Sequence, residues 1–172
     1  MQQQGAVPIH FNIVGKGPEY EKLVALTNDL NLNGHVTFHD FKTGKDLDVV
    51  YEENDVAIGT LGFHRIGITN SSSLKNREYF ARGLPIVLST NDLDMPATLP
   101  FVKYLPEGEE PIAIGEVVKY AQRVYQTPDL NYVIRSYAEE HISWKSKTKT
   151  VLEYLSRHVK PSVETKKFKI YS

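Results

Sequence analysis

The sequence predicts an α/β domain with an open parallel sheet that carries helices on both faces. Short apolar runs of strand length alternate with helix-length segments along the chain, which is the pattern of a parallel sheet with crossover helices. Glycine and proline stand at many of the boundaries between these segments, where turns require them. The 172 residues are 41% hydrophobic and 24% charged, as in an ordinary globular domain with enough chain to bury a core.

The first half of the chain alternates strands with helices. We expect strands at 9–14, 36–38 and 55–59, the last with the apolar character of a buried parallel strand. The helix after the first strand is opened by a proline and carries leucines spaced by three and four. A second helix is expected around residues 47–51, and a third from Ser72 or Ser73 to Gly83.

The second half is mainly helical. Strands are expected at 85–89 and 101–105, and helices at about 111–126, 129–141 and 143–158. On the helix that ends at Gly83, a rotation of 100° per residue places Leu74 and Ala81 on the inward stripe and Glu78 at its border.

No linker or repeat divides the chain. We therefore expect one domain over residues 9–158. Residues 1–8 would be a flexible lead-in or a cloning-derived start, and residues 159–172 a basic tail.

Composition excludes several classes of function. Twenty Lys and Arg against 21 Asp and Glu give a net charge of −1, which argues against nucleic acid as the main partner. The absence of cysteine excludes disulfides, thiolate metal sites and a cysteine nucleophile, and the six histidines show no metal-ligand spacing.

Neither a membrane-spanning run nor a secretory signal is visible, so we expect a cytoplasmic protein. The lysines of the tail leave two alternatives open. They would contact an anionic membrane surface, here the inner face, or form a solvated or packed end.

Ligands of open parallel sheets bind where the strands end, so the loops at that edge are the candidates. The turn with Gly15 and Gly17 lacks the third glycine of a dinucleotide fingerprint, because Tyr20 stands there. It is either an anion-binding turn or a plain strand-to-helix connection. In the next loop, Phe41 and Lys42 would contact a base, or serve as a core plug and a solvated side chain.

The loop from Thr60 to Ser71 is the most informative. It is long for a connection inside an α/β unit, and it brings His64 and Arg65 to the binding edge. Serines then run into a helix start, where hydroxyls and free backbone N–H groups suit a diphosphate. The alternative is an ordinary serine N-cap.

The helix itself places Glu78 between Lys75 and Arg82 on one side. A surface ion-pair network would explain these three charges, at only about 0.3–0.5 kcal/mol per pair. A functional explanation is a carboxylate that accepts hydrogen bonds from ribose hydroxyls. The residues alone leave both open.

Four stretches of the sequence resemble the group 1 (retaining) glycosyltransferases. The first stretch, residues 72–87, follows the family's pattern of Ser or Pro, Leu, Lys, two variable residues, Glu-Tyr, then Ala, Gly and Pro before a strand. Residues 13–19 are similar to the family's Gly-x-Gly-Pro turn, 36–41 to its next strand and loop, and 142–144 to its closing Ser-Trp. The resemblance covers roughly residues 9–158. It implies the C-terminal, Rossmann-like lobe of a two-lobed GT-B enzyme.

The resemblance implies a nucleotide-diphosphate sugar as donor and transfer of the sugar, with retention, to an acceptor hydroxyl. By this resemblance Glu78 binds the ribose of the donor. Lys75 and the backbone N–H groups near Ser72, Ser73 and Leu74 would hold the diphosphate. The protein's part in the chemistry would be charge stabilisation of the leaving diphosphate.

Other loops receive roles from the same resemblance. Phe41 and Lys42 would lie against the base, and Gly15 and Gly17 would line the cleft. From their place in the 60–71 loop, and not from the resemblance, Arg65 and His64 would reach the donor sugar or its phosphates; the alternative for the histidine is a solvated or hydrogen-bonded side chain. No cofactor or metal is implied, because helix N-termini and cations would supply the positive charge.

The sequence departs from the family pattern in two ways. The family often carries a Glu eight residues before the ribose Glu, where this chain has Asn70. By the same resemblance, we expect the family's first strand–helix unit, with its Arg and Lys, and the N-terminal acceptor lobe to fall outside this sequence. We therefore expect a glycosyltransferase as the full-length protein and an inactive fragment here. The alternatives are a lobe of a sugar-nucleotide epimerase, or a non-catalytic nucleotide-binding or scaffold module.

Overall fold

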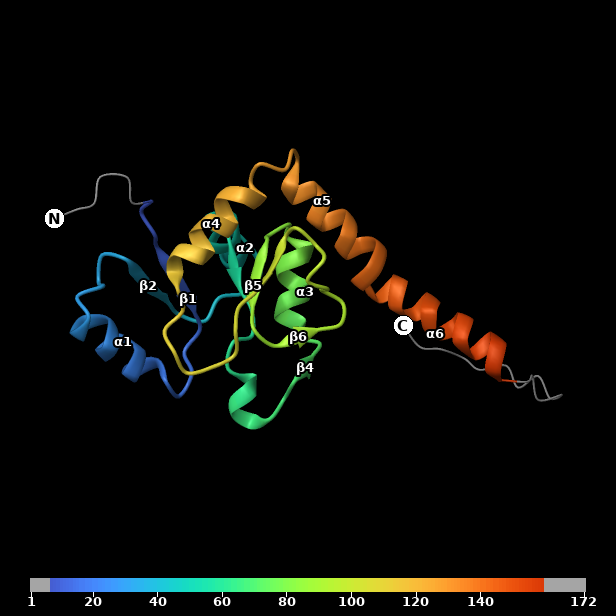
Figure 1. Ribbon diagram of the computed structural model, residues 1–172, viewed down its shortest axis with the longest axis horizontal. Coiled ribbons are helices and arrows are strands. Elements are labelled where there is room, and N and C mark those ends of the chain that lie inside the picture. Colours follow the sequence, from blue (N-terminus) through green and yellow to red (C-terminus); the bar gives the residue numbers. More distant parts are fainter. Residues whose placement is uncertain (1–6, 160–172) are drawn as a thin grey trace.

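The computed structural model describes residues 7–159 and confirms the α/β class, with every strand pair parallel (Figure 1). The elements in chain order are β1 (Phe11–Val14), α1 (Tyr20–Asp29), β2 (Val36–His39), α2 (Gly44–Glu52), β3 (Ala57–Ile58), η1 (Phe63–Ile66), β4 (Asn70–Ser71), α3 (Leu74–Ala81), β5 (Ile86–Leu88), β6 (Asn91–Asp92), β7 (Val102–Tyr104), α4 (Ile114–Val124), α5 (Leu130–Tyr137), η2 (Ala138–Ile142) and α6 (Trp144–His158). The short strands β4 and β6 were not predicted.

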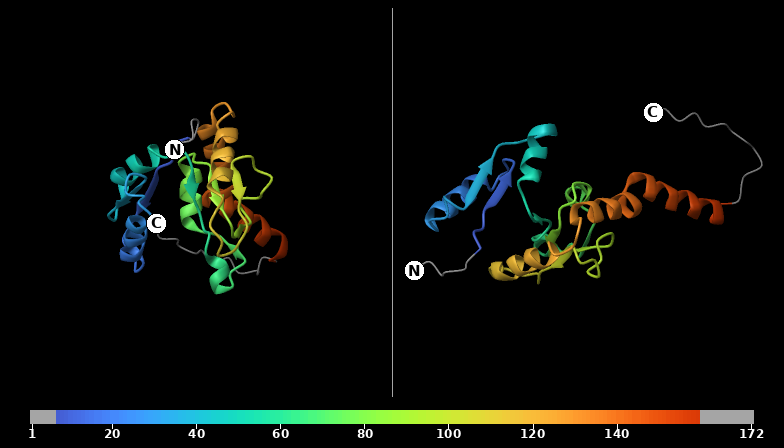
Figure 2. Two further views of the ribbon diagram at one scale, coloured as in Figure 1. Left: turned by 60° about the vertical axis from the view of Figure 1, so that its left-hand side comes forward. Right: turned by 90° about the horizontal axis from the view of Figure 1, so that it is seen from above.

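The parallel strands are divided among three small sheets, with the orders β1-β2, β3-β5-β7 and β4-β6. A sheet continues only where adjacent backbones pair, and within residues 7–159 β1 pairs with β2 alone and β3 with β5 alone. A side-chain hydrogen bond, Asn12 Nδ2 to Asn54 Oδ1 at 3.1 Å, joins β1 to the segment before β3. In Figure 2, β1, β2, α1 and α2 lie together on one side of the remaining elements.

The core lies around β5, whose residues Ile86, Val87 and Leu88 are all fully buried. This confirms the expected buried strand in an all-apolar run. Phe80 of α3 packs edge-to-face on Phe101, with ring centroids 5.5 Å apart, and both rings also contact Tyr137. Helices α3, α4 and α5 are held on this core through such side chains.

The inward face of α3 differs from the prediction. Leu74 is 72% exposed and Ala81 is also exposed, whereas Asn76 and Phe80 are fully buried. Phe80 buries far more apolar area than Leu74 would, and Asn76 finds a buried partner in Asp92, 3.3 Å from its Nδ2. The side of α3 that carries Leu74, Ala81 and Glu78 therefore faces away from the core.

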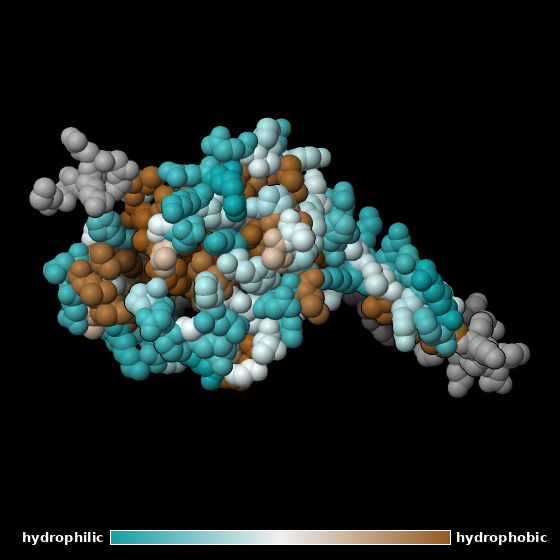
Figure 3. Space-filling model, in the orientation of Figure 1, coloured by the Kyte–Doolittle hydropathy of each residue, from teal (hydrophilic) through white to brown (hydrophobic). Residues whose placement is uncertain are grey.

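Helix α1 remains largely uncovered. Its residues Leu26 and Leu30, which the leucine spacing predicted for an apolar stripe, are both exposed. The space-filling view shows apolar surface over α1 (Figure 3).

Helix α6 extends away from the body of the molecule (Figure 1). Its start was predicted correctly, because Ser143 caps it by accepting a hydrogen bond from the Ser146 N–H at 3.1 Å. The predicted lead-in at 1–8 and the basic tail at 159–172 fall almost entirely outside the described residues. Among the helices of residues 7–159, not one is both long and apolar enough to cross a membrane.

Candidate functional site

A cavity of about 820 Å³ opens between α3 and the segment from α5 to α6. Three of the residues expected at a donor site lie in its wall: Ser72, Leu74 and Glu78. The other lining residues were not selected from the sequence as donor-binding residues; they are Arg77, Ala81, Asp94, Arg135, Ala138, Glu139, Ile142, Ser143, Trp144 and Lys147. The outward side of α3 thus meets both carboxylates and cations there.

Glu78 stands on α3 with its side chain 42% exposed. Arg82 lies one turn further on, and its Nη1 is 3.2 Å from Glu78 Oε1. Burial of Tyr51, together with the negative charge of Glu78, raises the pKa of Tyr51 to about 12, so this phenol stays protonated at neutral pH. A carboxylate that keeps solvent access beyond its arginine partner can accept a further hydrogen bond from a hydroxyl.

The N-terminus of α3 leaves backbone donors available. Ser73 is the N-cap residue and adopts an extended conformation, but its side chain makes no capping hydrogen bond within the described chain. The first N–H groups of a helix have no intrahelical acceptor, and the helix dipole makes this end favourable for anions. Ser72 beside it lines the cavity, so this uncapped helix end lies at the cavity edge.

Lys75 points to the end of β3 rather than into the cavity wall. Its Nζ donates to the Gly59 carbonyl oxygen at 3.2 Å. Lys75 as a whole is exposed, but partial desolvation of its ammonium by the surrounding protein lowers its pKa below the usual value. The cation nevertheless lies at the carboxyl edge of the sheet, where open parallel sheets bind ligands.

Arg65 is held in an ion pair within the chain. Its Nε lies 2.8 Å from Glu109 Oε1, and His64 Nε2 is 3.0 Å from the same oxygen. These hydrogen bonds lower the pKa of Glu109 to about 2. The guanidinium of Arg65 and the imidazole of His64 therefore share one carboxylate from the loop after β7.

Asn70 is part of β4 and faces β6. Its Oδ1 accepts a hydrogen bond from Asn91 Nδ2 at 2.6 Å, and its own Nδ2 is 3.2 Å from the hydroxyl of Thr69. The amide is exposed but carries no charge, so position 70 lacks the negative charge of the glutamate that the family often has there.

The remaining predicted residues lie at the ends of β1 and β2, and none of them lines the cavity. Gly15 adopts a φ of +106°, which favours glycine, and its N–H donates to the His39 carbonyl at 3.2 Å. Phe41 is 80% exposed and is therefore no core plug. Together with Gly17 and Lys42, these residues belong to the β1–β2 unit, whose strands pair only with each other within residues 7–159.

The sequence reasoning missed a charge cluster around Asp94. Arg77 and Lys147 both contact the Asp94 carboxylate, and Arg77 Nη1 also lies 3.6 Å from the buried Asp92. Burial acts to raise the pKa of Asp94, but the hydrogen bonds from Lys147 and Arg77 outweigh it, so the pKa is lowered. Arg77 stands at a variable position of the family pattern, and Lys147 is 53 residues from Asp94, so no local spacing could have revealed the cluster.

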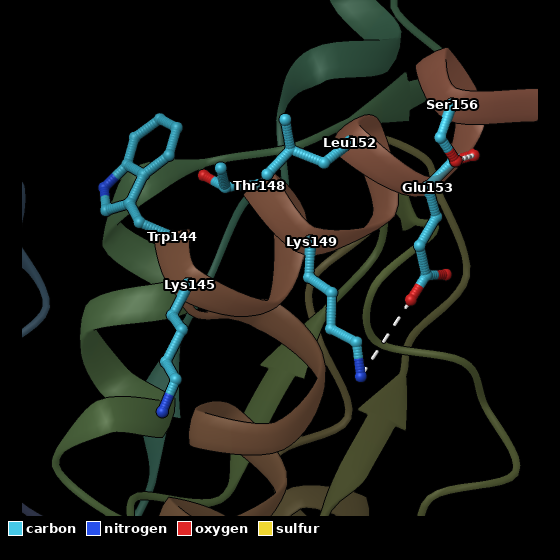
Figure 4. A pocket seen from close by; sticks show the side chains of 7 residues that line it. All are labelled: Trp144, Lys145, Thr148, Lys149, Leu152, Glu153 and Ser156. Carbon is cyan, nitrogen blue, oxygen red and sulfur yellow. Dashed lines mark hydrogen bonds and ion pairs between the residues drawn. The ribbon is translucent and has the colours of Figure 1, made fainter. Parts of the chain in front are cut away.

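A second hollow follows one face of α6 (Figure 4). Its described lining comes from this one helix, and its only drawn contact is the Lys149–Glu153 ion pair of 3.9 Å. A single helix face does not enclose a ligand. Residues 7–159 also hold no group of three or more His, Asp or Glu side chains that could bind a metal ion.

Comparisons with known proteins identify one family and solved structures of similar fold. The family model described as glycosyl transferases group 1 matches residues 1–101. The crystal structure of the pneumococcal O-GlcNAc transferase GtfA in complex with UDP and GlcNAc superposes with a TM-score of 0.57 at 16% identity. That match covers 86% of this chain but only 29% of GtfA. No curated protein matches the sequence.

Proposed function

The chain belongs to the group 1 glycosyltransferases, and from this membership we propose that it forms the lobe that binds a nucleotide-diphosphate sugar. The proposed reaction is transfer of the sugar, with retention, to an acceptor hydroxyl. The acceptor would bind to a second lobe, because the chain spans only 29% of the length of GtfA. The observation that carries the proposal is the position of Glu78 on the cavity side of α3.

Glu78 is proposed to bind the ribose. Its carboxylate lies in the cavity wall with its side chain 42% exposed, while Phe80 two residues later is fully buried. A ribose offers two neighbouring hydroxyl donors, and an ionised carboxylate offers only acceptors. The pairing would be charge-assisted and therefore stronger than one between neutral groups.

The diphosphate is proposed to bind at the N-terminus of α3. The Ser73 side chain leaves the first N–H groups uncapped, and Ser72 and Leu74 line the adjoining cavity. Lys75 adds a cation at the end of β3. This arrangement would stabilise the negative charge that develops on the leaving diphosphate during transfer.

The loops after β1 and β2 are proposed to take the base. Phe41 is exposed enough to stack on an aromatic ring, and Lys42 follows it. The turn at Gly15 and Gly17 allows close approach of a ligand to the backbone, because at each a Cβ would meet nothing within 4 Å. The donor would then extend from this unit to the end of β3.

Calorimetric titration of the full chain with UDP, GDP and ADP tests the proposal. We expect one of them to bind and Glu78→Ala to weaken this binding about tenfold or more, the loss of a charged hydrogen bond. Glu52→Ala is the matched control, because Glu52 is an exposed carboxylate at the end of α2. Equal affinities of Glu78→Ala and the unchanged chain would refute the ribose role.

A further inference from the structure

Arg82, which follows the last residue of α3, is clamped between two helices. Its Nη1 lies 3.2 Å from Glu78 Oε1 on its own helix, and its Nη2 lies 2.5 Å from Asp48 Oδ1 on α2. The ring of Tyr51, also on α2, lies 4.3 Å from the guanidinium carbon. One planar cation is therefore fixed on an edge by each carboxylate and on a face by the ring.

The clamp restricts the orientation of Glu78. A guanidinium presents its donors in a rigid fork, so fixing its plane on Tyr51 and one edge on Asp48 also fixes the direction of the remaining donors. One of these holds Glu78 Oε1, and the carboxylate keeps further lone pairs that can accept from another donor. The Arg82 backbone is tied as well, because its carbonyl accepts from Arg135 Nη2 at 3.2 Å.

Arg82 stands behind Glu78 with respect to the cavity. Glu78 is one of the described residues of the cavity wall, and Arg82, Asp48 and Tyr51 are not. Any effect of these three on a ligand in the cavity would therefore pass through the Glu78 carboxylate.

We propose that Arg82, held by Asp48 and Tyr51, is a positioning residue that orients Glu78 to accept from the ribose hydroxyls. The inference rests on the proposed function and deepens it, because it makes α2 a determinant of selectivity for ribose. An arginine that merely neutralised Glu78 would compete with the ribose, and its removal would strengthen ribose binding. A positioning arginine predicts the opposite.

The experiment measures ribose selectivity rather than affinity alone. The full chain is titrated with UDP, GDP and ADP, each beside its 2′,3′-dideoxy analogue, and the ratio of the two dissociation constants is compared among variants. The unchanged chain should prefer the ribose form by about tenfold or more, the value of a hydrogen bond to a charged group. Glu78→Gln should reduce this ratio strongly.

Arg82→Ala should bring the ratio close to one while leaving the affinity for the dideoxy analogue unchanged. Arg82→Lys should retain part of the ratio, because an ammonium can reach one carboxylate but cannot bridge two in a fixed plane. Asp48→Asn provides a second variant should Arg82→Ala fail to fold, and we expect it to lower the ratio too. Arg123→Ala is the matched control, because Arg123 also lies over a tyrosine, Tyr120, but on α4.

The outcomes separate the two proposals. If Glu78→Gln loses the ratio while Arg82→Ala and Asp48→Asn keep it, the positioning role is wrong and the proposed function stands. An increased ratio in Arg82→Ala would likewise overturn the inference, because Arg82 would then be a competitor of the ribose. If the unchanged chain shows no ribose preference, the ribose role of Glu78 fails and the inference fails with it.

Discussion

Glu109 and Arg65 form a two-point ion pair, with Nε 2.8 Å from Oε1 and Nη2 2.5 Å from Oε2. The pair joins two loops that are 44 residues apart in the sequence. Because the planar guanidinium fork matches the carboxylate, both loops are constrained in orientation as well as in distance. An anionic ligand that binds Arg65 through Nε and Nη2 must first displace Glu109.

The ion pair should be visible in the titration of Glu109. Hydrogen bonds from Arg65 and His64 lower its pKa from 4.5 to about 2. Because the folded-state value is the lower one, the stabilisation is present above pH 4.5 and is lost as the pH falls towards 2. We expect carboxylate NMR to give a pKa near 2, and Arg65→Ala to move it upwards. A titration near 4.5 in the unchanged chain would show that the pair does not persist in solution.

Two substitutions on α3 test which of its faces is buried. Phe80 is fully buried among aromatic rings, so Phe80→Ala should reduce the free energy of unfolding by about 3–5 kcal/mol. Leu74 is exposed, and Leu74→Ala should change it by less than about 0.5 kcal/mol. Urea denaturation measures both. If Leu74→Ala lowered the free energy of unfolding by several kcal/mol, Leu74 would be on the buried face, as helical periodicity predicted.

The sequence predicts well those features that depend on neighbouring residues. The run Ile86–Leu88 is apolar throughout and forms the buried strand β5, and Ser143 begins α6 as a serine N-cap should. In each case the residues that decide the structure stand within a few positions of one another. The fold class and the element order follow from such local signals.

The orientation of α3 depends on distant partners and could not be predicted in this way. A buried Asn76 contradicts hydrophobicity alone and is tolerated because Asp92, 16 residues later, accepts its hydrogen bond. The division of the sheet is equally non-local. It follows from which backbone edges pair, and strand-length apolar runs such as 9–14 do not reveal their neighbours.

The Asp94 cluster should hold α6 to the core. Arg77 and Lys147 contact its carboxylate, and the lowered pKa means that this stabilisation exists above pH 3.8 and disappears below it. Asp94→Asn should therefore speed hydrogen exchange in α6 at pH 7, while Glu153→Gln, an exposed change on α6, should have little effect. Equal exchange in Asp94→Asn and the unchanged chain would show that α6 is held by other contacts.

We expect the charge of Lys75 to lower the stability of the fold and to raise its affinity for a nucleoside diphosphate. Burial lowers its pKa, so the charged form costs stability at neutral pH, and the cost is relieved only as the pH rises towards 10.5. Lys75→Met keeps most of the side-chain volume without the charge. We expect a Tm equal to or above that of the unchanged chain, with nucleoside diphosphate affinity about tenfold weaker, as for a lost charged contact.

Lys119→Met on α4, where the lysine is exposed, is the control and should change neither quantity. A lower Tm for Lys75→Met would show that the hydrogen bond to Gly59 outweighs the cost of burial, and an unchanged affinity would remove Lys75 from the diphosphate site.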